Sequence, residues 1–522
     1  MAPCSDVYFA HGGDGGLRPV DRSRQIAVSW ALCPNPVRYG GADDIGCADA
    51  VLITASGSGP DFAAAGLDPG DFEKVEEGGG LALWMKKERP PPQDTPAATP
   101  SLVRELAGLT APAFVIAASA VAAGWTGALL GLLLFSTMMT FPPLAGFSPS
   151  PLFVVAVSAL CPAAVCLFRP WLRRGIADTA GGGRGRFLNF AMAAGLLFGI
   201  IAGTLALSHT FVAPNGLGVS GGRAKLMYAA GGIPPGFFTD RARRTLQPVY
   251  PPGQAMITLG CYGLAGGCGE WLTQLVGVTA GALVFVWLGF HAATLPARLW
   301  VLAVMISPLA LRMGSLYYSE TFVALFTLVG WERLSKDSGD PAGWLLAGAA
   351  GWFKNEGLVY LLAIWLILNF RGLWRIAGWR NLALAAALPA AWHIWCRSHG
   401  ATLDDFGALL RPDIFQAWAA VVRMCKYAFA EPWLYGFAFP AALVALMFPA
   451  CRSPGLKQTV AVSGLCVISL AFIFAISESP YLDWQFKSLE RLLWVPSLLL
   501  VREVAYLFLK KQRMSRVSTA HG

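Results

Sequence analysis

The segment LNFAMAAGLLFGIIAGTLALS (residues 188–208) runs directly into HTFVAPNGLGVSGGRAKLMYAAGGIPPGFFTDRARRTLQPVYPP (residues 209–252), and this junction decides the fold. The first segment carries no charge and is long enough to cross a bilayer, because a span needs about 20 apolar residues. The second is a long polar loop with five Lys or Arg residues and one acid, Asp240. A membrane protein that keeps such a basic loop is expected to handle an anionic group at the membrane surface.

The composition indicates a membrane protein along most of the chain. Of the 522 residues, 55% are hydrophobic and 14% are charged, and the mean hydropathy is +0.53. A soluble chain would have about a quarter charged residues. Apolar runs recur from about residue 111 to residue 509. We therefore predict an all-α polytopic membrane protein.

The net charge of +9 does not indicate nucleic-acid binding, because Lys and Arg cluster in short loops beside the apolar segments. Such residues set the topology and contact anionic membrane lipids. The 11 cysteines are scattered and form no CxxC pair, so neither a disulfide framework nor a metal site is predicted.

Residues 1–88 differ from the rest, with many Asp and Glu and no apolar run long enough to span. Short β-like pieces at Ala48–Thr54, Phe72–Glu76 and Gly80–Met85 predict a small cytoplasmic α/β module. The Pro-rich stretch RPPPQDTPAATP at residues 89–100 is then a linker.

Basic loops orient the spans. Residues 169–186, the loop at Glu332–Lys336 and the tail at Arg502–Arg516 are all rich in Lys and Arg, so we place them in the cytoplasm. The loop 209–252 then lies outside, after one outward crossing by residues 188–208.

Parity constrains the segments that follow this loop. Between the outer loop 209–252 and the inward span 320–331 lie three apolar stretches: 254–267, 271–291 and 299–313. The span 320–331 must start on the outer side, so only two of these three stretches can cross the membrane. The stretch 254–267 is too short to span, so we expect a short interfacial or re-entrant helix there. The prediction is about 12 transmembrane helices with both termini cytoplasmic.

Several motifs occur in a fixed order after residue 187. They are Arg223-Ala224-Lys225, Tyr250-Pro251-Pro252-Gly253, Gly266-Gly267, Glu320, Lys354-Asn355-Glu356-Gly357 and Arg491. This order resembles the GT-C superfamily of polyprenyl-phosphate-dependent glycosyltransferases. The nearest branch contains protein O-mannosyltransferases and the aminoarabinose or galacturonic acid transferases of bacterial lipid A. The resemblance covers a transmembrane core at 187–509, leaving extra N-terminal transmembrane helices at 101–186 and a basic cytoplasmic tail at 510–522.

The resemblance implies an enzyme of the bacterial inner membrane whose active site faces outward. A sugar is carried on a polyprenyl phosphate, and a hydroxyl or amine of a lipid, glycan or protein acceptor attacks its anomeric carbon with inversion. The lipid phosphate leaves. No nucleotide, other cofactor or metal is implied, and the partners are the lipid-linked sugar, its acceptor and membrane lipids.

Cationic and polar side chains would hold the departing phosphate, because negative charge develops on it in the transition state. Arg binds phosphate through its planar fork and Lys binds it as a point charge. The candidate residues for binding the lipid phosphate and the substrate are Asn215, Arg223, Lys225, Tyr250, Lys354, Asn355 and Arg491.

The acceptor needs a general base. The family pattern implies an Asp around residues 213–216, but Asn215 stands there, and an amide cannot act as a base at neutral pH. The candidates for this catalytic role are therefore Asp240, Glu320 and Glu356.

Other interpretations stay open. The missing acid near Asn215 favours a noncatalytic relative that binds the lipid carrier, and a transporter or flippase of lipid-linked sugars or a surface-polysaccharide polymerase is a further alternative. Plainer roles exist for single residues: Arg223 and Lys225 can anchor headgroups, Glu320 can cap its helix, and Arg491 can reach from the bundle toward the interface.

Overall fold

The computed structural model describes the chain in separate stretches. These are residues 7–9, 51–55, 72–78, 81–86, 102–173, 184–208, 220–234, 236–238, 249–370, 376–401, 414–448, 451–476 and 489–520. The predicted site residues Asn215 and Asp240 lie outside them.

Four strands are described in the N-terminal 88 residues: β1 Val7–Phe9, β2 Val51–Ala55, β3 Phe72–Gly78 and β4 Leu81–Lys86. They form one sheet in the order β1-β2-β4-β3, in which β1 and β2 are parallel and the other pairs are antiparallel. The last three strands overlap the three β-like pieces of the sequence. The described part of this region contains strands alone, so the predicted α/β character of the module stays a prediction.

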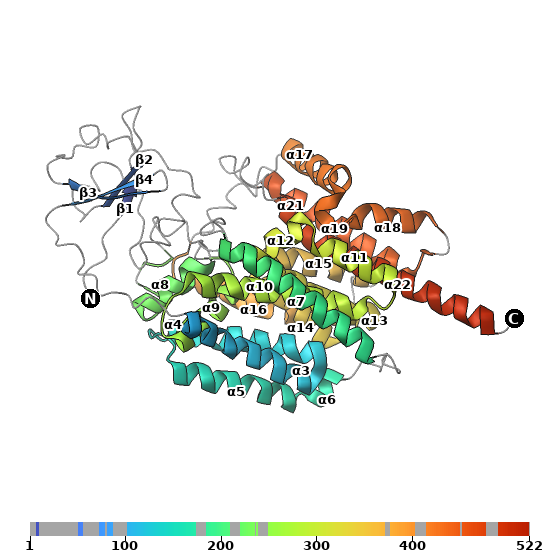
Figure 1. The fold of residues 1–522 in the computed structure, drawn as a ribbon, viewed down its shortest axis with the longest axis horizontal. Helices are drawn as coiled ribbons and strands as arrows, with labels where there is room; N and C mark the ends of the chain where they lie inside the picture. The colour runs from blue at the N-terminus through green and yellow to red at the C-terminus, as the bar shows by residue number, and fades with distance from the viewer. Residues whose placement is uncertain are drawn as a thin grey trace.

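All the described elements from residue 102 onward are helical (Figure 1). The first group comprises α3 Leu102–Met138, α4 Phe141–Leu144, α5 Pro151–Leu167, α6 Arg169–Arg173, α7 Arg184–Ser208, α8 Gly222–Ala230, α9 Gly253–Ala265 and α10 Glu270–His291. The central group comprises α11 Leu295–Met305, α12 Pro308–Ser315, α13 Glu320–Lys336, α14 Pro341–Phe353, α15 Glu356–Asn369 and α16 Ile376–Ser398. The last group comprises α17 Ile414–Cys425, η6 Lys426–Ala430, η7 Pro432–Tyr435, α18 Ala438–Met447, α19 Pro454–Ile476, α21 Leu489–Leu492 and α22 Trp494–Ala520.

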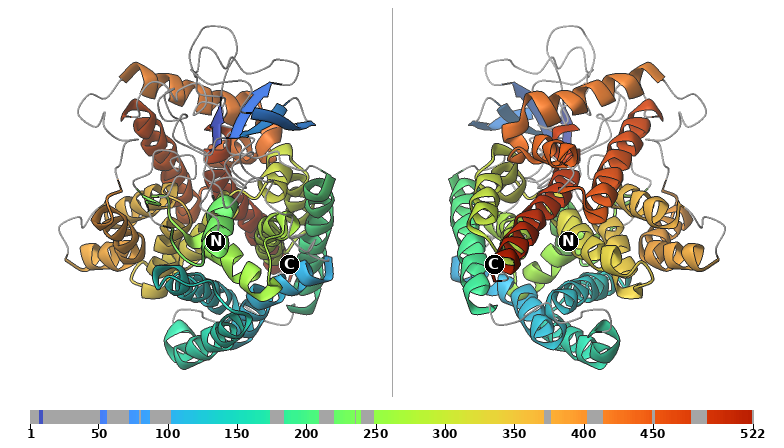
Figure 2. Two further views of the ribbon diagram at one scale, coloured as in Figure 1. Left: turned by 90° about the vertical axis from the view of Figure 1, so that its left-hand side faces the viewer. Right: turned by 90° about the vertical axis from the view of Figure 1, so that its right-hand side faces the viewer.

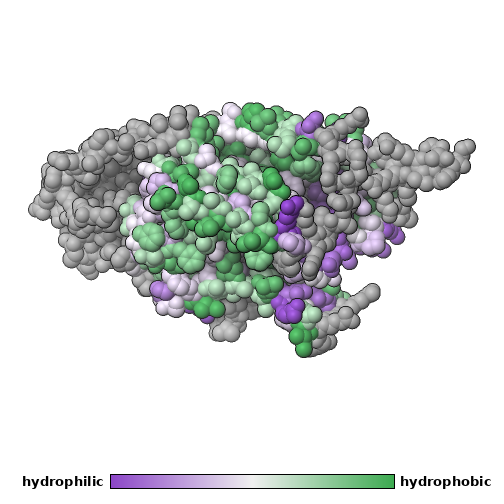
Figure 3. All heavy atoms as spheres, turned by 90° about the horizontal axis from the view of Figure 1, so that it is seen from below, coloured by the Kyte–Doolittle hydropathy of each residue, from purple (hydrophilic) through white to green (hydrophobic). Residues whose placement is uncertain are grey.

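Several of these helices are long and apolar enough to cross a membrane. By length and composition, four helices among the described residues can cross a bilayer, or five if α11 and α12, which are bent by 60°, form one span. The shorter helix α5 is apolar as well, and its Leu152 and Leu167 are 79% and 80% exposed. Figure 3 shows a broad hydrophobic surface on one side of the bundle. This agrees with an all-helical membrane protein.

Helix α3 is a hairpin rather than one long rod. Its backbone leaves helical geometry at Ala123 and Gly124, and Gly124 has a φ of 61°. A Cβ added at Gly131 would lie 2.2 Å from the Ser119 hydroxyl and 3.2 Å from Val115. In a straight helix, Val115 and Gly131 would stand about 24 Å apart along the axis. The two halves of α3 are therefore antiparallel neighbours.

Contacts at the apex and at both ends of α3 fix the position of the hairpin in the bundle. The apex of α3 lies at the end of the bundle where α13 finishes, because Arg333 donates to the Thr126 hydroxyl at 3.0 Å. Both ends of α3 contact α9: Gly108 approaches Cys261, and Phe135 approaches Gly260. The start of α3 and the end of α22 lie at opposite ends of the bundle. The predicted count of about 12 crossings and the predicted cytoplasmic location of both termini stay predictions, because residues 1–6, 521 and 522 lie outside the described residues.

The short helix predicted at residues 254–267 is α9, which is about 20 Å long at 1.5 Å per residue and is too short to span. It is buried along nearly its whole length, from Gly253 to Gly263. A helix resting in the membrane interface would expose one face to lipid. The structure instead encloses α9 in protein between α3, α5 and α8, and the choice between an interfacial and a re-entrant helix stays a prediction.

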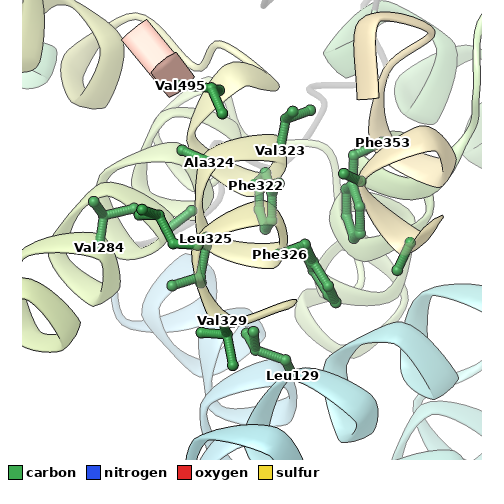
Figure 4. Packing of buried hydrophobic residues seen from close by; sticks show 14 of the residues in the cluster. Leu129, Val284, Phe322, Val323, Ala324, Leu325, Phe326, Val329, Phe353 and Val495 are labelled. Carbon is green, nitrogen blue, oxygen red and sulfur yellow. The ribbon is translucent and has the colours of Figure 1, made fainter. Parts of the chain in front are cut away.

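The core around α13 is aromatic and aliphatic (Figure 4). The ring of Phe353 at the end of α14 stacks on Phe322 and Phe326, with ring centroids 4.9 Å apart in both pairs. Stacked rings add stabilisation beyond the area that they bury. Because α13 and α14 are locked together in this way, the residues at their ends keep a fixed position.

We call the end of α14 at Lys354 the site end, and the end at Asp340 the opposite end. At the opposite end, Arg333 forms a buried ion pair with Asp340 and also donates to the Leu172 carbonyl at 3.1 Å. Asp340 in turn caps α14 by accepting from the Ala342 and Gly343 amides at 3.2 and 3.3 Å. One arginine therefore joins α13, α14 and the N-terminal helices.

The α3 hairpin predicts a disulfide that a straight helix would forbid. In a Ser119→Gly background, which makes room for the new Cβ, Val115→Cys and Gly131→Cys should cross-link on oxidation. Disulfide-linked peptides identified by mass spectrometry would show this. The pair Val121→Cys and Gly131→Cys is the control and should stay reduced, because Val121 is 85% exposed. A failure of the first pair to cross-link would contradict the hairpin.

The Arg333 network predicts a large loss of stability on substitution. Arg333→Leu should lower the free energy of unfolding by about 3–5 kcal/mol, because it leaves Asp340 as a buried unpaired charge. Adding Asp340→Asn should recover part of this loss, since Asn is neutral and can still cap α14. Thermal unfolding in detergent measures both effects. Lys336→Ala breaks an exposed pair with Glu332 and should cost less than about 1 kcal/mol.

Candidate functional site

Two carboxylates hold a partly buried lysine at the site end of the bundle. The Lys354 ammonium lies 2.9 Å from Glu320 Oε1 and 2.9 Å from Glu356 Oε1. Glu320 begins α13, Glu356 begins α15, and Lys354 follows the last residue of α14. Three separate helix ends thus meet at one cation.

Arg491 completes this group. Its guanidinium lies 3.5 Å from Glu320 Oε1 and stands over the ring of Tyr318, 4.5 Å from the ring centroid. Arg491 and Glu320 are 6% and 3% exposed. We call Glu320, Lys354, Glu356 and Arg491 the charge cluster. Its members balance as two cations and two anions, as burial in an apolar bundle requires.

Close helix contacts fix the two segments that carry these side chains. A Cβ added at Gly357 would lie 2.2 Å from the Ala350 backbone, so only glycine lets α15 turn back against α14 directly after Lys354. The Tyr360 hydroxyl of α15 donates to the Leu492 carbonyl at 2.9 Å. The same helix therefore positions Glu356 directly and holds the short helix that bears Arg491.

The predicted basic element and the Tyr-Pro-Pro turn form one unit. Arg223 donates to the Tyr250 carbonyl at 2.7 Å and to the Pro251 carbonyl at 3.1 Å. Trp392 of α16 donates to the Tyr250 carbonyl as well, at 3.1 Å. Arg223 is 2% exposed. Its guanidinium clamps the backbone that leads into α9, which is a positioning role within the protein.

The clamped turn lies against the charge cluster. A Cβ added at Gly253 would lie 2.7 Å from the Trp352 carbonyl and 2.9 Å from the Phe353 ring, so the start of α9 touches the residues just before Lys354. Tyr250 interacts electrostatically with Arg223, Lys354 and Arg491. Tyr250 therefore links the Arg223 clamp to the charge cluster.

Backbone strain occurs beside Glu320. Tyr317 has a φ of 55°, and it is one of two described residues other than glycine in this left-handed region. Its carbonyl accepts from Gln254 at 3.1 Å, and its hydroxyl forms a hydrogen bond with Thr258. Non-glycine residues keep such a conformation only where the surroundings enforce it, often at functional sites. Here α9 enforces the turn that presents Tyr318 and Glu320 to Arg491.

Burial and pairing act in opposite directions on the two cations that lie outside the spans. Burial alone would lower the pKa of Lys354, but Glu320 and Glu356 raise it above its ordinary value. Burial lowers the pKa of Arg223 to about 10, although Cys396, Tyr317 and Tyr250 partly oppose this shift. Both side chains therefore stay cationic at neutral pH.

One carboxylate oxygen of the cluster keeps an open hydrogen-bonding position. Glu356 Oε2 is buried, and it has no hydrogen-bond partner among the described residues. Its other oxygen holds Lys354. The neighbouring Asn355 is engaged differently, because its Oδ1 lies 3.1 Å from His393 Nε2 of α16. An oriented carboxylate with one unused oxygen can accept a proton from a bound hydroxyl or amine.

The structure thus groups Glu320, Lys354, Glu356 and Arg491 directly, and it places Tyr250 and Asn355 beside them. Lys225 is half-buried on α8, two residues after Arg223. Sequence reasoning did not assign contacts to Tyr318, Trp392 or His393. The spacing of Trp392 and Trp395 on α16 and of His399 directly after it was a usable signal, because these rings pack in series and Trp392 also donates to the Tyr250 carbonyl.

Comparisons of the chain with protein-family models, with curated proteins and with solved structures found no match.

The docking of α9 against Trp352 predicts a position-specific effect of a single methyl group. Gly253→Ala should destabilise the protein by about 1–3 kcal/mol, because the new Cβ overlaps the Trp352 carbonyl and cannot be accommodated without moving backbone. Gly267→Ala is the matched control, since nothing lies within 4 Å of its added Cβ. Thermal unfolding of the two variants in detergent compares them. Equal unfolding temperatures would show that α9 does not pack as described.

Proposed function

We propose that the protein transfers a sugar from a polyprenyl-phosphate carrier to an acceptor, with the charge cluster as its active centre. The observation that carries the proposal is the arrangement of Lys354, Arg491 and Glu356. Two cations lie together with a carboxylate at one end of an apolar bundle, and one oxygen of that carboxylate has no hydrogen-bond partner among the described residues. Ionisable residues inside membrane bundles are costly and mark functional sites by default.

The chemistry divides among these residues. Glu356 Oε2 takes the proton from the acceptor hydroxyl or amine as the acceptor atom forms a bond to the anomeric carbon. The bond between that carbon and the phosphate oxygen breaks, and its electron pair stays with the lipid phosphate. Lys354 and Arg491 stabilise the negative charge that gathers there. The proton ends on Glu356, and the anomeric carbon is inverted.

Glu320 acts as a positioning residue in this scheme. Its Oε1 lies near both Lys354 and Arg491 and holds the two cations together. Arg223 acts further away, through the carbonyls of Tyr250 and Pro251. Of the three candidate bases, Asp240, Glu320 and Glu356, we assign the role of base to Glu356 and the positioning role to Glu320.

The proposed location is the bacterial inner membrane with the site end outward. The described basic residues at the opposite end support this orientation, because Arg333 and Lys336 end α13 there.

A second candidate is a noncatalytic protein that binds the lipid carrier. The observation that favours it is that Lys354 and Arg491 are already paired with carboxylates, while Asn215 stands where the resemblance implies an acid. Such a protein would bind polyprenyl phosphate without consuming its sugar.

Two substitutions separate catalysis from binding. In nanodiscs supplied with a panel of polyprenyl-phosphate hexoses and pentoses, Glu356→Gln should lower the transfer rate by about 10²–10⁴-fold, because it removes the base. It should leave the affinity for polyprenyl phosphate nearly unchanged. Lys354→Gln combined with Glu356→Gln should weaken carrier binding as well, since it removes a phosphate partner without leaving Glu356 as an unpaired carboxylate.

Glu332→Gln is the matched control for these variants, because Glu332 pairs with Lys336 on α13 at the opposite end of the bundle. It should change neither transfer nor binding. Carrier binding with no turnover in the wild-type protein would favour the noncatalytic candidate. If neither binding nor turnover responds to Lys354 and Glu356, the charge cluster is not the site.

A further inference from the structure

Helix α17 has two unlike faces. Phe415, Trp418 and Val422 stand three and four residues apart, on one side of the helix, and are 82%, 67% and 49% exposed. Phe429 continues this stripe in η6 and is 50% exposed. Trp418, Val422 and Phe429 thus form a row of large apolar side chains with exposed fractions of 49–67%.

The other face of α17 packs on the bundle. Ala420, Met424 and Ala428 are four residues apart and are 0–4% exposed. This face contacts α19 and α21. The exposed stripe is thus a different face from the one that packs on the protein, because α17 already has a buried side.

The orientation of α17 differs from that of the spans. Figure 2 looks along the long axis of the molecule, and the orange helix at its upper edge lies across the view. A helix that crosses the bundle axis lies roughly parallel to the membrane plane. The chain then continues through η7 into α18, where Leu443, Val444 and Met447 are also 50–68% exposed. Along the chain, the exposed apolar residues of α17 are thus followed by those of α18.

Basic residues accompany the stripe. Arg423 and Lys426 are exposed at its end, and the Lys426 ammonium lies 3.4 Å from Glu431. A helix with large apolar residues on one side and Lys or Arg beside them is the pattern of helices that lie in the headgroup layer. The basic residues favour a surface with anionic lipids.

This helix is connected to the charge cluster. After η6, the Tyr435 hydroxyl of η7 donates to the Glu490 carbonyl at 2.9 Å. Glu490 also forms an ion pair with Arg312 of α12, and it directly precedes Arg491. Trp300 of α11 donates to the Gly436 carbonyl at 2.7 Å and fixes the same turn. The segment from α17 to η7 thus supports the short helix α21, which bears Arg491.

We propose that α17 is an interfacial anchor whose exposed stripe is inserted in the bilayer at the boundary of headgroups and acyl chains. The occupant of the stripe is the lipid surface itself, with anionic headgroups beside Arg423 and Lys426. This contact holds α21 and Arg491 at the level of the lipid headgroups. The inference depends on the faces of α17 and not on the reaction proposed above.

Site-directed spin labelling tests the anchor. A nitroxide at Trp418→Cys, in a protein whose native cysteines are replaced by Ser, is placed in bilayers of phosphatidylcholine with phosphatidylglycerol. It should collide more with oxygen, which concentrates in the bilayer, than with a water-soluble nickel chelate. A label at Ser338→Cys, which is exposed at the opposite end, is the aqueous control.

Three further measurements on the spin-labelled protein test the proposed anchor. Equal access of the chelate to labels at 418 and 338 would overturn the proposal. Dipolar broadening between labels at 418 would also overturn it, because a second copy of the chain would then cover the stripe. Replacing Arg423 and Lys426 by Gln should make the label at 418 shallower in anionic bilayers and leave it unchanged in phosphatidylcholine alone. No change in the anionic bilayers would contradict the role of these two cations.

Discussion

The structure depends on how charge is kept inside an apolar bundle. Lys354 is held between Glu320 and Glu356, and Arg491 shares Glu320 with it. Removing such ions from water costs several kcal/mol each, and only close pairing offsets that cost. Each of the four side chains comes from a different helix end or turn, so the pairing also fixes how α13, α14, α15 and α21 meet.

The surrounding packing serves this arrangement by bringing backbones close together. Gly357 allows α15 to start against α14, and Gly253 allows α9 to touch the residues before Lys354. Arg223 holds the turn before α9 through two carbonyls, and α9 in turn maintains the strained conformation of Tyr317 beside Glu320. At the opposite end, Arg333 and Asp340 tie the same two central helices to the N-terminal hairpin. The two ends of α13 thus carry ion pairs of different kinds. At the opposite end, Arg333 and Asp340 form a buried structural pair. At the site end, Glu356 Oε2 has no hydrogen-bond partner within the part of the chain that the structure describes.

The sequence allowed prediction of the helical membrane class, the short non-spanning helix after Tyr250-Pro251-Pro252, and the gathering of Glu320, Lys354 and Arg491 at one side. These features follow from apolar length, parity and the side on which polar residues fall. The α3 hairpin could not be predicted in this way, because its apex at Ala123 and Gly124 lies within a continuous apolar run and carries no polar turn residue. The role of Arg223 was also not predictable from pattern, since an arginine that binds carbonyls and one that binds phosphate look the same in a sequence. The charge balance of the cluster depends on distances between segments far apart in the chain, which spacing alone does not give. Asn215 and Asp240 lie outside the described residues, so their predicted roles stay predictions.

The most direct measurement is a structure of the protein determined with a short-chain polyprenyl phosphate bound. The phosphate is predicted to lie within about 4 Å of both the Lys354 ammonium and the Arg491 guanidinium, the range of a paired charge, with Glu356 Oε2 facing the open side of the phosphate. A phosphate bound at the opposite end near Arg333, or at the bilayer surface away from Lys354, would contradict the assignment of the charge cluster as the functional centre.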